Sequence, residues 1–542
     1  MRTRAAFALV VFLFAGHAAA QWNPPAGQWG KTEPTDVRIM TWNIQDALCR
    51  TNSKTEDLND WCAIARIVAA LKPDILLLQE CGDNSGQGTG SGVDSVAQLT
   101  TVMGYFFNGG LDSFKGNTPI TSWVKKYDPN YGLDHVYVSV VTDNFNRNVL
   151  VSRWPFQDLN GDSQFAISNF AMDPDLYAPG GSGGIRGIIF AEINLPDAVY
   201  AGDIVAGTMH MKSGGSSGDL ADRLAASKNI AYYIDYLFNG GGTLVPDPRN
   251  KIFDAGVTSI LGPSTPVVWG GDVNEDENTN GRDGPARWMA SAQVLGGTDG
   301  TDRDRSDSTY DDARDPFNNN RSTFSSSKLD YMLWQDSIAT LRRAFIFNSG
   351  SVGSNTHPPE CIGYPGSPAL VSSFASDHRP VIIDLILPLA VLPPGSFTLN
   401  SPADGSVGVS LTTTLEWSAS AGAAGYSVVI SESPSLSPVL WSDSTVATSI
   451  AVPSGVLQFC TEYYWGVTAS NSGGSTPSSP VSWMFESYRP ADFDGSGFVD
   501  IEDYTAFVLA FEEGGDDADF DGSGFVDIED FSAFVLAFEE GC

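Results

Sequence analysis

The sequence is poor in basic residues. It has 30 Lys and Arg against 65 Asp and Glu over 542 residues, which gives a formal net charge of −35. A surface with so few cations lacks the Lys and Arg that neutralise phosphates. The chain as a whole is therefore not expected to bind nucleic acid passively, and any contact with a polyanion would need a local concentration of positive charge.

Long apolar runs are also missing after residue 20. No later run approaches the roughly 20 apolar residues that cross a bilayer, so no transmembrane segment is expected. Residues 1–20 have the pattern of a secretory signal, with Arg2 and Arg4 before the apolar run 5–15 and Ala18-Ala19-Ala20 before Gln21. The sequence predicts an exported protein that is extracellular or attached to a cell surface or a complex.

Cysteine and histidine are scarce. The six Cys show no CxxC spacing, which argues against a zinc site. Export permits disulfides, and the number of cysteines leaves the connectivity open. Cys49 and Cys62 bracket a polar stretch, so they are the local pair that we expect to be bonded. With only five His in the chain, a histidine inside a motif carries information.

Apolar runs of strand length alternate with Gly, Asn, Asp and Ser-rich loops from 37 to 387. Segments 62–71 and 219–237 have helical spacing instead. Strands mixed with helices predict an α/β (α+β) layered sandwich for this large first domain. The expected strands are 37–42, 75–79, 136–141, 148–152, 187–193, 203–210, 266–269, 331–334 and 381–387.

The chain beyond 387 is organised differently. Residues 388–394 are Pro-rich and predict a short stiff linker. Residues 395–488 have short alternating strands separated by Ser, Gly and Pro turns. This region resembles a fibronectin type III or immunoglobulin-like β-sandwich, with Trp417 and either Tyr464 or Trp465 as core aromatics. We expect it to be a spacer.

Residues 491–542 contain an internal repeat. The segment Ala491 to Asp503 recurs as Ala518 to Asp530, and residues 491–542 contain ten Asp, six Glu and no Lys or Arg. Carboxylates, a hydroxyl and a main-chain carbonyl fall at positions 1, 3, 5, 7, 9 and 12 of an EF-hand-type loop, with Gly497 and Gly524 at position 6. The predicted Ca²⁺ ligands are Asp492, Asp494, Ser496, Phe498, Asp500 and Asp503 in one copy, and Asp519, Asp521, Ser523, Phe525, Asp527 and Asp530 in the other.

Two features of these repeats resemble dockerin modules. The last ligand is Asp where ordinary EF-hands have Glu, and no helix precedes the loop. The resemblance implies docking to a cohesin-type scaffold protein. The helix segment 506–511 departs from it, because it is mostly apolar and offers no evident polar recognition pair. The alternative is a terminal cap that calcium stabilises.

Six short motifs are dispersed through the first domain. They are Thr41-Trp42-Asn43-Ile44, Gln79-Glu80, Met209-His210-Met211-Lys212, Gly271-Asp272-Val273-Asn274, Leu329-Asp330-Tyr331 and Ser376-Asp377-His378-Arg379-Pro380. Together and in this order they resemble the endonuclease/exonuclease/phosphatase superfamily, the hydrolases related to deoxyribonuclease I. The resemblance implies a four-layered α/β sandwich and metal-dependent hydrolysis of phosphoesters.

The resemblance also implies the residues that hold the metal and the phosphate. Glu80, at the end of an apolar strand, is the expected carboxylate for Mg²⁺ or Mn²⁺, and Asn43 is a second ligand or a phosphate contact. Asp377 faces the metal or its water. Arg186 and Asn148 resemble the arginine and asparagine that relatives direct at the substrate phosphate.

The remaining motif residues are expected to act on protons and water. His378 is the general base or acid, and Asp330 holds its ring. Asp272 and Asn274 are two residues apart, so extended backbone would place both on one face, where they orient the attacking water. His210 resembles the second histidine of deoxyribonuclease I, neutral sphingomyelinases and inositol polyphosphate phosphatases.

Three functions remain open at this point. The first is a secreted, divalent-metal-dependent phosphodiesterase that acts as a nuclease on nucleic acid. The second is a sphingomyelinase-like or other phosphoester phosphatase; it would place Tyr105-Phe106-Phe107 against lipid, whereas we expect these aromatics in the core. The third is a catalytically inactive, scaffold-attached binding protein. Four cations, Lys125, Lys126, Lys212 and Arg223, either form a basic rim or are scattered solvated charges.

Overall fold

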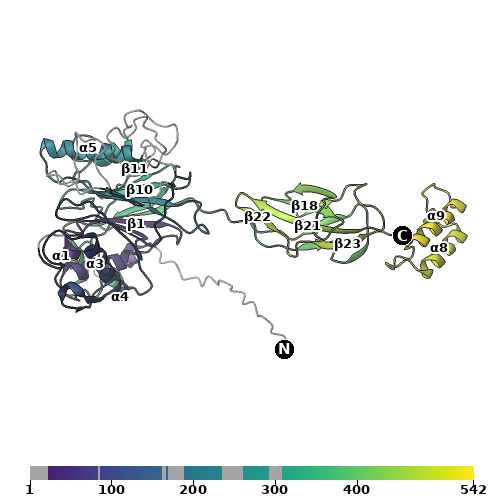
Figure 1. Ribbon diagram of the computed structural model, residues 1–542, viewed down its shortest axis with the longest axis horizontal. Coiled ribbons are helices and arrows are strands. Elements are labelled where there is room, and N and C mark those ends of the chain that lie inside the picture. Colours follow the sequence, from purple (N-terminus) through teal and green to yellow (C-terminus); the bar gives the residue numbers. More distant parts are fainter. Residues whose placement is uncertain are drawn as a thin grey trace. The chain divides into compact units, whose positions relative to one another are not determined.

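The chain forms two compact units, Met1–Leu389 and Ala390–Cys542 (Figure 1). The computed structural model describes residues 22–82, 86–161, 166–168, 188–234, 238, 261–291, 308–353 and 355–541. The predicted signal segment and Arg186 lie outside these ranges. Within them, no helix has both the length and the apolar character needed to span a membrane.

The first unit is built on two six-stranded sheets. One sheet has the order β13 (Thr340–Ile346), β14 (Val381–Ile386), β1 (Val37–Asn43), β2 (Ile75–Gln79), β6 (Val149–Ser152) and β5 (His135–Val138). The other has the order β11 (Ser308–Tyr310), β12 (Asp330–Gln335), β10 (Val267–Asp272), β9 (Ile204–His210), β8 (Ile188–Ile193) and β7 (Ala166–Ser168). The prediction of a mixed α/β fold is confirmed.

Three apolar cores show how the layers pack. One core lies between the faces of the two sheets. A second joins the β1 sheet to the helices α1 (Ala47–Arg50), α2 (Asp60–Leu71), α3 (Val96–Asn108) and α4 (Val124–Tyr127). The third joins the β10 sheet to α5 (Ser217–Tyr233) and α6 (Pro285–Ser291). Helices thus cover the outer face of each sheet (Figure 1).

Smaller elements complete this unit. They are the hairpin β3 (Gly110–Asp112) and β4 (Thr118–Ile120), the short helix α7 (Val371–Ala375), and the 3-10 turns η1 (Pro24–Ala26), η2 (Ser113–Lys115), η5 (Pro359–Cys361) and η6 (Pro368–Leu370).

The strand register gathers the ends of the motifs at one edge of both sheets. β1 and β2 are parallel and end together, with Asn43 opposite Gln79. β9 and β10 are also parallel and end with His210 opposite Asp272. The antiparallel neighbour β12 begins at Asp330, opposite Asp272, and β14 begins beside Thr41 of β1. Because parallel strands finish at the same edge, segments far apart in sequence meet there.

Helices α2 and α3 begin at local capping signals. The Asn59 side chain accepts a hydrogen bond from the Cys62 amide at the start of α2. At the start of α3, Ser95 and Gln98 form a reciprocal capping box, which satisfies two otherwise unpaired amides. α3 was not among the predicted helices, although this Ser-x-x-Gln signal is visible in the sequence.

One expectation about a side chain is wrong, and the expectation of core aromatics at Phe106 and Phe107 is confirmed. Cys62 is a buried free thiol, so the predicted bond to Cys49 is absent. Its Sγ lies 3.5 Å from the Tyr127 hydroxyl, because α2 turns this side chain toward α4. Phe106 and Phe107 are buried in the core beneath α3, so they are not available to contact lipid.

The second unit contains a β-sandwich. One sheet has three strands, β15 (Leu399–Ser401), β17 (Thr414–Trp417) and β20 (Ser449–Ala451). The other has β16 (Ser406–Val409), β23 (Trp483–Ser487), β21 (Glu462–Asn471), β18 (Gly425–Ser431) and β19 (Trp441–Thr445), and β22 (Gly474–Pro477) also pairs with β21. Trp417 and Trp465 are buried in its core, as expected.

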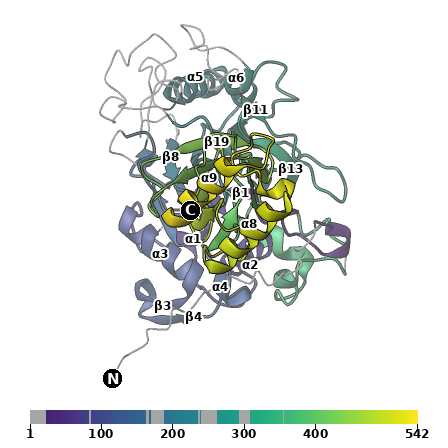
Figure 2. The same ribbon diagram turned by 90° about the vertical axis from the view of Figure 1, so that its right-hand side faces the viewer.

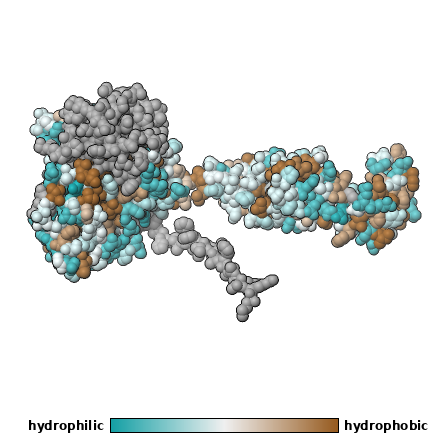
Figure 3. All heavy atoms as spheres, viewed as in Figure 1, coloured by the Kyte–Doolittle hydropathy of each residue, from teal (hydrophilic) through white to brown (hydrophobic). Residues whose placement is uncertain are grey.

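Two helices follow the sandwich, α8 (Ile501–Glu513) and α9 (Ile528–Glu540), with the turn η7 (Asp516–Ala518) between them. They lie side by side (Figure 2), and the rings of Phe507 and Phe534 stack with centroids 3.9 Å apart. The apolar helix face thus makes the internal core of the pair. Other apolar side chains stay exposed there (Figure 3): Phe498, Ile501, Leu509, Phe525, Ile528 and Leu536.

Candidate active site

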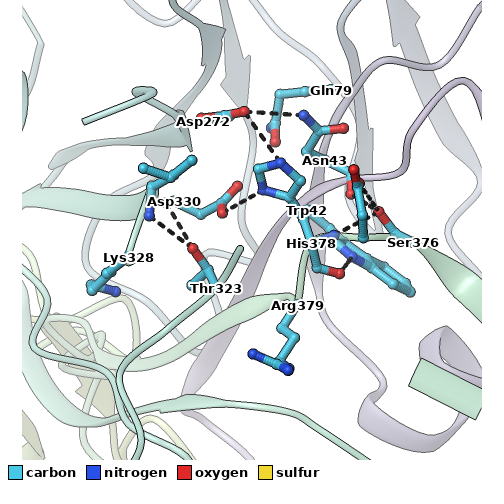
Figure 4. Close-up of polar contacts among 12 residues, drawn as sticks. Trp42, Asn43, Gln79, Asp272, Thr323, Lys328, Asp330, Ser376, His378 and Arg379 are labelled. Atoms are coloured by element: carbon cyan, nitrogen blue, oxygen red, sulfur yellow. Dashed lines mark hydrogen bonds and ion pairs between the residues drawn. The ribbon is translucent and has the colours of Figure 1, made fainter. Parts of the chain in front are cut away.

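His378 and Asp330 form a buried pair at the shared edge of the sheets. The His378 Nδ1 atom lies 2.8 Å from Asp330 Oδ2 (Figure 4). The segment that carries His378 is fixed by two further hydrogen bonds: Trp42 Nε1 donates to the His378 carbonyl at 3.0 Å, and the His378 amide donates to Ser376 Oγ at 3.1 Å. The Asp330 contact leaves Nε2 as the ring atom available for chemistry.

Asp272 lies at the centre of the site. Its Oδ2 accepts a hydrogen bond from Asn43 Nδ2 at 3.1 Å and lies 3.4 Å from His210 Nε2 and 3.7 Å from His378 Nε2. Its Oδ1 accepts from the Asn274 amide at 2.8 Å. Residues from both sheets therefore converge on one buried carboxylate.

Asn274 reaches this position by a bend rather than by extended backbone. Its φ is 56°, in the left-handed region that asparagine tolerates better than most residues. Its side-chain amide donates to the Met211 carbonyl at 3.0 Å. The expectation that Asp272 and Asn274 lie on one face of an extended strand is wrong, because β10 ends at Asp272.

Glu80 joins the site from the end of β2. Its φ is 56°, which is uncommon for a residue of this kind, and its Oε1 lies 3.6 Å from His210 Nε2. The same imidazole nitrogen thus faces the carboxylates of Glu80 and Asp272. Asp377 is exposed next to His378 in the chain, with its Oδ1 3.4 Å from Ser376 Oγ.

Burial and charge shift the pKa values of two site residues in the same direction. Burial and the nearby negative charge of Asp330 raise the pKa of Asp272 to about 7. Burial alone would lower the pKa of His378, but the charge and hydrogen bond of Asp330, followed by the charges of Asp272 and Asp377, raise it to about 10. At neutral pH the imidazole is therefore protonated beside carboxylates.

The donor set suits a hard divalent cation, which prefers carboxylate and amide oxygens. Asp272, Asp330 and His378 each offer one ligand atom, and these atoms lie within 4.8 Å of one another. One Asp330 oxygen, Oδ1, is buried without a hydrogen-bond partner. However, binding through His378 Nδ1 would break its bond to Asp330. The carboxylates of Glu80 and Asp272, which lie 3.6 and 3.4 Å from His210 Nε2, offer oxygens without that cost.

Two residues support the site without having been assigned a role from sequence. Gln79 Nε2 donates to Thr208 Oγ1 at 2.8 Å and to Thr41 Oγ1 at 3.1 Å, and so joins β2 to β9. Thr323 Oγ1 accepts from the amides of Leu329 and Asp330 at 2.9 and 3.2 Å. Gln79 stands next to the motif glutamate, whereas no pattern in the sequence marks Thr323, whose role depends on a tertiary turn.

Asn148 was predicted to contact the substrate phosphate. The four nearby cations were expected either to form a basic rim or to be scattered solvated charges. Asn148 is buried directly before β6, and its predicted phosphate contact stays a prediction. Lys212 lies 3.4 and 3.2 Å from Asp219 and Asp222, while Arg223 lies 2.9 Å from Glu275.

Lys125 and Lys126 belong to α4 on the far side of the β1 sheet, where they pair with Asp134 and Glu56. Among the described residues, none of the four predicted rim cations is thus without a carboxylate partner.

Other cations near His378 point away from it (Figure 4). The Lys328 ammonium is buried 2.7 Å from Asp311 and lies over the Tyr331 ring. Arg379 donates from Nη1 to the Ser322 carbonyl at 3.1 Å. In the part of the chain that the structure describes, Lys328 is thus neutralised by Asp311, and Arg379 is bonded to a carbonyl rather than directed at His378.

Comparison with solved structures finds several chains with partial similarity to this one. One is an endonuclease/exonuclease/phosphatase from Beutenbergia cavernae, with 15% identity, a TM-score of 0.36, and coverage of 82% of this chain and 100% of that chain. Another is the human Nocturnin catalytic domain with bound sulfate, with 13% identity, a TM-score of 0.37, and coverage of 65% and 95%. A third, from Bacteroides vulgatus, has 13% identity, a TM-score of 0.33, and coverage of 65% and 99%.

A search of curated protein sequences found no match. A family model does match, and it covers residues 40–378, which include every motif residue placed above from Asn43 to His378. This is more than half of the chain. The protein belongs to the endonuclease/exonuclease/phosphatase family.

Proposed function

We propose that this protein is a secreted, divalent-metal-dependent phosphodiesterase whose catalytic centre is the cluster around Asp272. The observation that carries the proposal is the buried His378–Asp330 pair, 2.8 Å apart, with His378 Nε2 directed toward Asp272. A binding module has no need of an oriented imidazole that can hold or release a proton. Members of the family are metal-dependent hydrolases of phosphoester bonds, which agrees with this assignment.

The chain's own residues supply proton handling and orientation. Asp272 Oδ2, with a pKa raised to about 7, can accept a proton from an attacking water, while the His378 imidazolium and the Asn43 amide donate to phosphoryl oxygens. The bond from phosphorus to the leaving oxygen breaks, and the proton reaches that oxygen through solvent. Asp330 keeps the imidazolium in place.

Glu80 and Asn43 are the residues that would hold the catalytic Mg²⁺ or Mn²⁺, with Asp377 next to them at the exposed side. A divalent cation, when bound, offsets the negative charge that develops on the phosphoryl group. His210 lies between Glu80 and Asp272, with its Nε2 3.6 Å from Glu80 Oε1 and 3.4 Å from Asp272 Oδ2. Asn148 and Arg186 remain proposed phosphate contacts.

Nucleic acid is the first substrate to test, and a sphingomyelinase-like or other phosphoester phosphatase activity is the second. The paired state of Lys212 and Arg223 favours a substrate that does not need a wide basic surface. A short oligonucleotide or a small phosphodiester meets that condition better than long duplex DNA. The buried Phe106 and Phe107 remove the argument for a lipid at α3.

The test is hydrolysis by the full chain of duplex DNA, RNA, bis-p-nitrophenyl phosphate, p-nitrophenyl phosphate and sphingomyelin, with Mg²⁺ or Mn²⁺ and then with excess chelator. We expect metal-dependent cleavage of diesters that the His378→Ala variant lacks. Turnover of monoesters or lipid alone would support the second substrate class. No turnover of any substrate would leave the inactive, scaffold-attached binding protein.

We also propose that the C-terminal repeats bind two Ca²⁺ ions. Three carboxylates come together in each loop, Asp492, Asp494 and Asp503 in one and Asp519, Asp521 and Asp530 in the other. In each loop one oxygen of the first Asp, Oδ1 of Asp492 and of Asp519, is buried without a hydrogen-bond partner. A buried, unpaired carboxylate oxygen is costly unless a cation occupies the site.

The other residues of each loop have different roles. Gly497 and Gly524 have φ values of 91° and 89°, so the turn at position 6 is the one that a Ca²⁺ loop requires. Asp500 and Asp527 accept from the amides of Glu502 and Glu529 and so cap α8 and α9. Ser496, Phe498, Ser523 and Phe525 remain proposed ligands.

The β-sandwich and the repeats are proposed to hold the enzyme outside the cell. In this proposal the fibronectin type III-like region is a spacer, and the dockerin-like repeats attach to a cohesin-type scaffold through their exposed apolar side chains. Removing residues 491–542 should then release the enzyme from its scaffold or cell surface without changing hydrolysis in solution. Retention of the truncated chain would show that the repeats are only a cap.

A further inference from the structure

A cavity of about 500 Å³ lies in the first unit, away from the motif cluster. It is lined by the start of β1, the end of α2 and the residues before β2 and after β6, among them Arg38, Lys72, Asp74 and Arg153. Catalytic Asn43 is at the other end of β1. Five residues of strand separate it from Arg38, which corresponds to about 17 Å at the usual rise per residue.

The walls of this cavity are held in place by buried Arg38. Its Nη1 donates to the carbonyls of Trp29 and Leu71 at 2.6 and 2.8 Å, and its Nε and Nη2 donate to Asp384 at 2.6 and 2.9 Å. These contacts tie the segment before β1 to the end of α2. Arg38 is therefore a structural anchor, and the cavity is formed before any ligand enters, as is usual for small-molecule sites of this size.

Two cations of the cavity are more exposed than the carboxylates with which they pair. Lys72 and Arg153 side chains are 46% and 50% exposed, whereas their carboxylate partners Asp128, Glu360 and Asp74 are 17%, 13% and 3% exposed. In each pair the cation is thus the group that a solute meets first. This arrangement stands out in a chain with a net charge of −35.

The two cations retain donors for a ligand. Asp74 is already saturated, because Lys31 and the Arg38 amide bind its Oδ2 and Arg153 Nη1 binds its Oδ1 at 2.8 Å. Within the described residues this is the only side-chain hydrogen bond of Arg153, so Nε and Nη2 remain. The Lys72 ammonium lies 2.7 Å from Asp128 and 3.5 Å from Glu360.

The backbone at Lys72 also points to a role for its side chain. Lys72 ends α2 with a φ of 49°, a left-handed conformation that favours glycine or asparagine. A lysine there stores strain that a smaller residue would not, and such strain is found where a side chain is needed.

We propose that this cavity is a second binding site, distinct from the catalytic centre, for a small phosphate-bearing molecule that Lys72 and Arg153 recognise. Guanidinium and ammonium groups are the usual partners of a phosphate dianion. The apolar lining from Leu71, Pro358 and Pro359 leaves room for an organic part such as a nucleoside.

The test measures binding of adenosine 5′-monophosphate to the full chain by calorimetry, in excess chelator so that metal-dependent turnover does not interfere. Inorganic phosphate is then added as a competitor. We expect saturable binding that phosphate competes with and that falls by at least about tenfold in Lys72→Asn and in Arg153→Gln. The Lys72→Asn variant should keep or raise the melting temperature, because asparagine suits the left-handed turn.

Two control variants make the outcome decisive. Lys125→Asn makes the same change at a lysine outside the cavity, and His378→Ala alters only the catalytic centre; both should bind normally. The proposal fails if no saturable binding occurs up to about 1 mM ligand, if His378→Ala loses binding while Lys72→Asn keeps it, or if inorganic phosphate does not compete. None of these results depends on whether the protein is an active phosphodiesterase.

Discussion

The protein brings carboxylates together in two regions and balances their charge differently in each. Around Asp272, two histidines and an asparagine face the acidic groups, with His378 Nδ1 2.8 Å from Asp330. In residues 491–542 there is no Lys or Arg at all, and Asp492 Oδ1 and Asp519 Oδ1 are buried without a partner. The first cluster carries its own counter-charge, and the second does not.

This difference in charge balance suggests that a cation serves catalysis in the first region and folding in the second. The catalytic cluster is expected to fold without metal, because an imidazolium and an amide face its carboxylates and Asp330 Oδ1 is the one oxygen of Asp272 and Asp330 that is buried without a partner. The repeats bury only a small apolar core around Phe507 and Phe534. A module of this size rarely folds on apolar burial alone, so we expect metal binding to supply part of its folding free energy.

The largest effect is expected from His378. The His378→Ala variant removes the oriented imidazolium and should lower kcat for diester hydrolysis by about 10²–10⁴-fold. The matched control is His135→Ala, a histidine of β5 outside the site, which should leave kcat unchanged. Equal kcat values for the His378→Ala variant and the unmodified chain, measured under metal saturation, would remove His378 from the mechanism.

The second effect is the response of the two regions to chelation. Calorimetry and far-ultraviolet circular dichroism of the full chain should show that excess chelator lowers the melting temperature of the repeats and reduces the helical signal of α8 and α9. The transition of the first unit should shift little. If chelator lowers the melting temperatures of both regions equally, the repeats do not depend on metal more than the first unit does.

Asp330→Asn should have a smaller effect on activity than loss of the histidine. The ring would keep a hydrogen-bond partner but lose the charge that stabilises the imidazolium, so kcat should fall by about 10–100-fold. The pKa of His378, followed by nuclear magnetic resonance of its ring protons, should fall as well, because Asp330 raises it. Exposed Asp336 provides the control Asp336→Asn. An unchanged His378 pKa would mean that Asp330 does not act through the ring.

The smallest effect concerns pH. The folded pKa of Asp272 is raised to about 7, above its ordinary value of 3.8, so folding favours the protonated carboxyl. Its contribution to stability is present below pH 4 and is lost as the pH rises through about 7. In chelator, the melting temperature of the unmodified chain should therefore fall across this range relative to that of Asp272→Asn. Parallel profiles would contradict the raised pKa, and added Mg²⁺ should reduce the difference.

Much of the first unit could be predicted because its strands are nearly continuous apolar runs. β2 was predicted with the bounds Ile75–Gln79 that the structure shows, since a strand buried on both faces has a clear apolar pattern. α3 was missed although its capping box is visible. The Cys49–Cys62 bond was wrong because proximity in sequence says little about the direction in which a helix turns a thiol.

The sequence by itself determined which residues we assign to the proposed catalytic centre and to the repeats, because motif order and ligand spacing can be read along the chain. Only the tertiary structure decided how their charges are balanced. It showed that Lys212 and Arg223 are paired, that Thr323 supports Asp330, and that Lys72 and Arg153 line a separate cavity. These properties depend on contacts between residues far apart in sequence. Burial and distance set the electrostatic energy of each pair, and no local sequence pattern indicates which residue will be the partner.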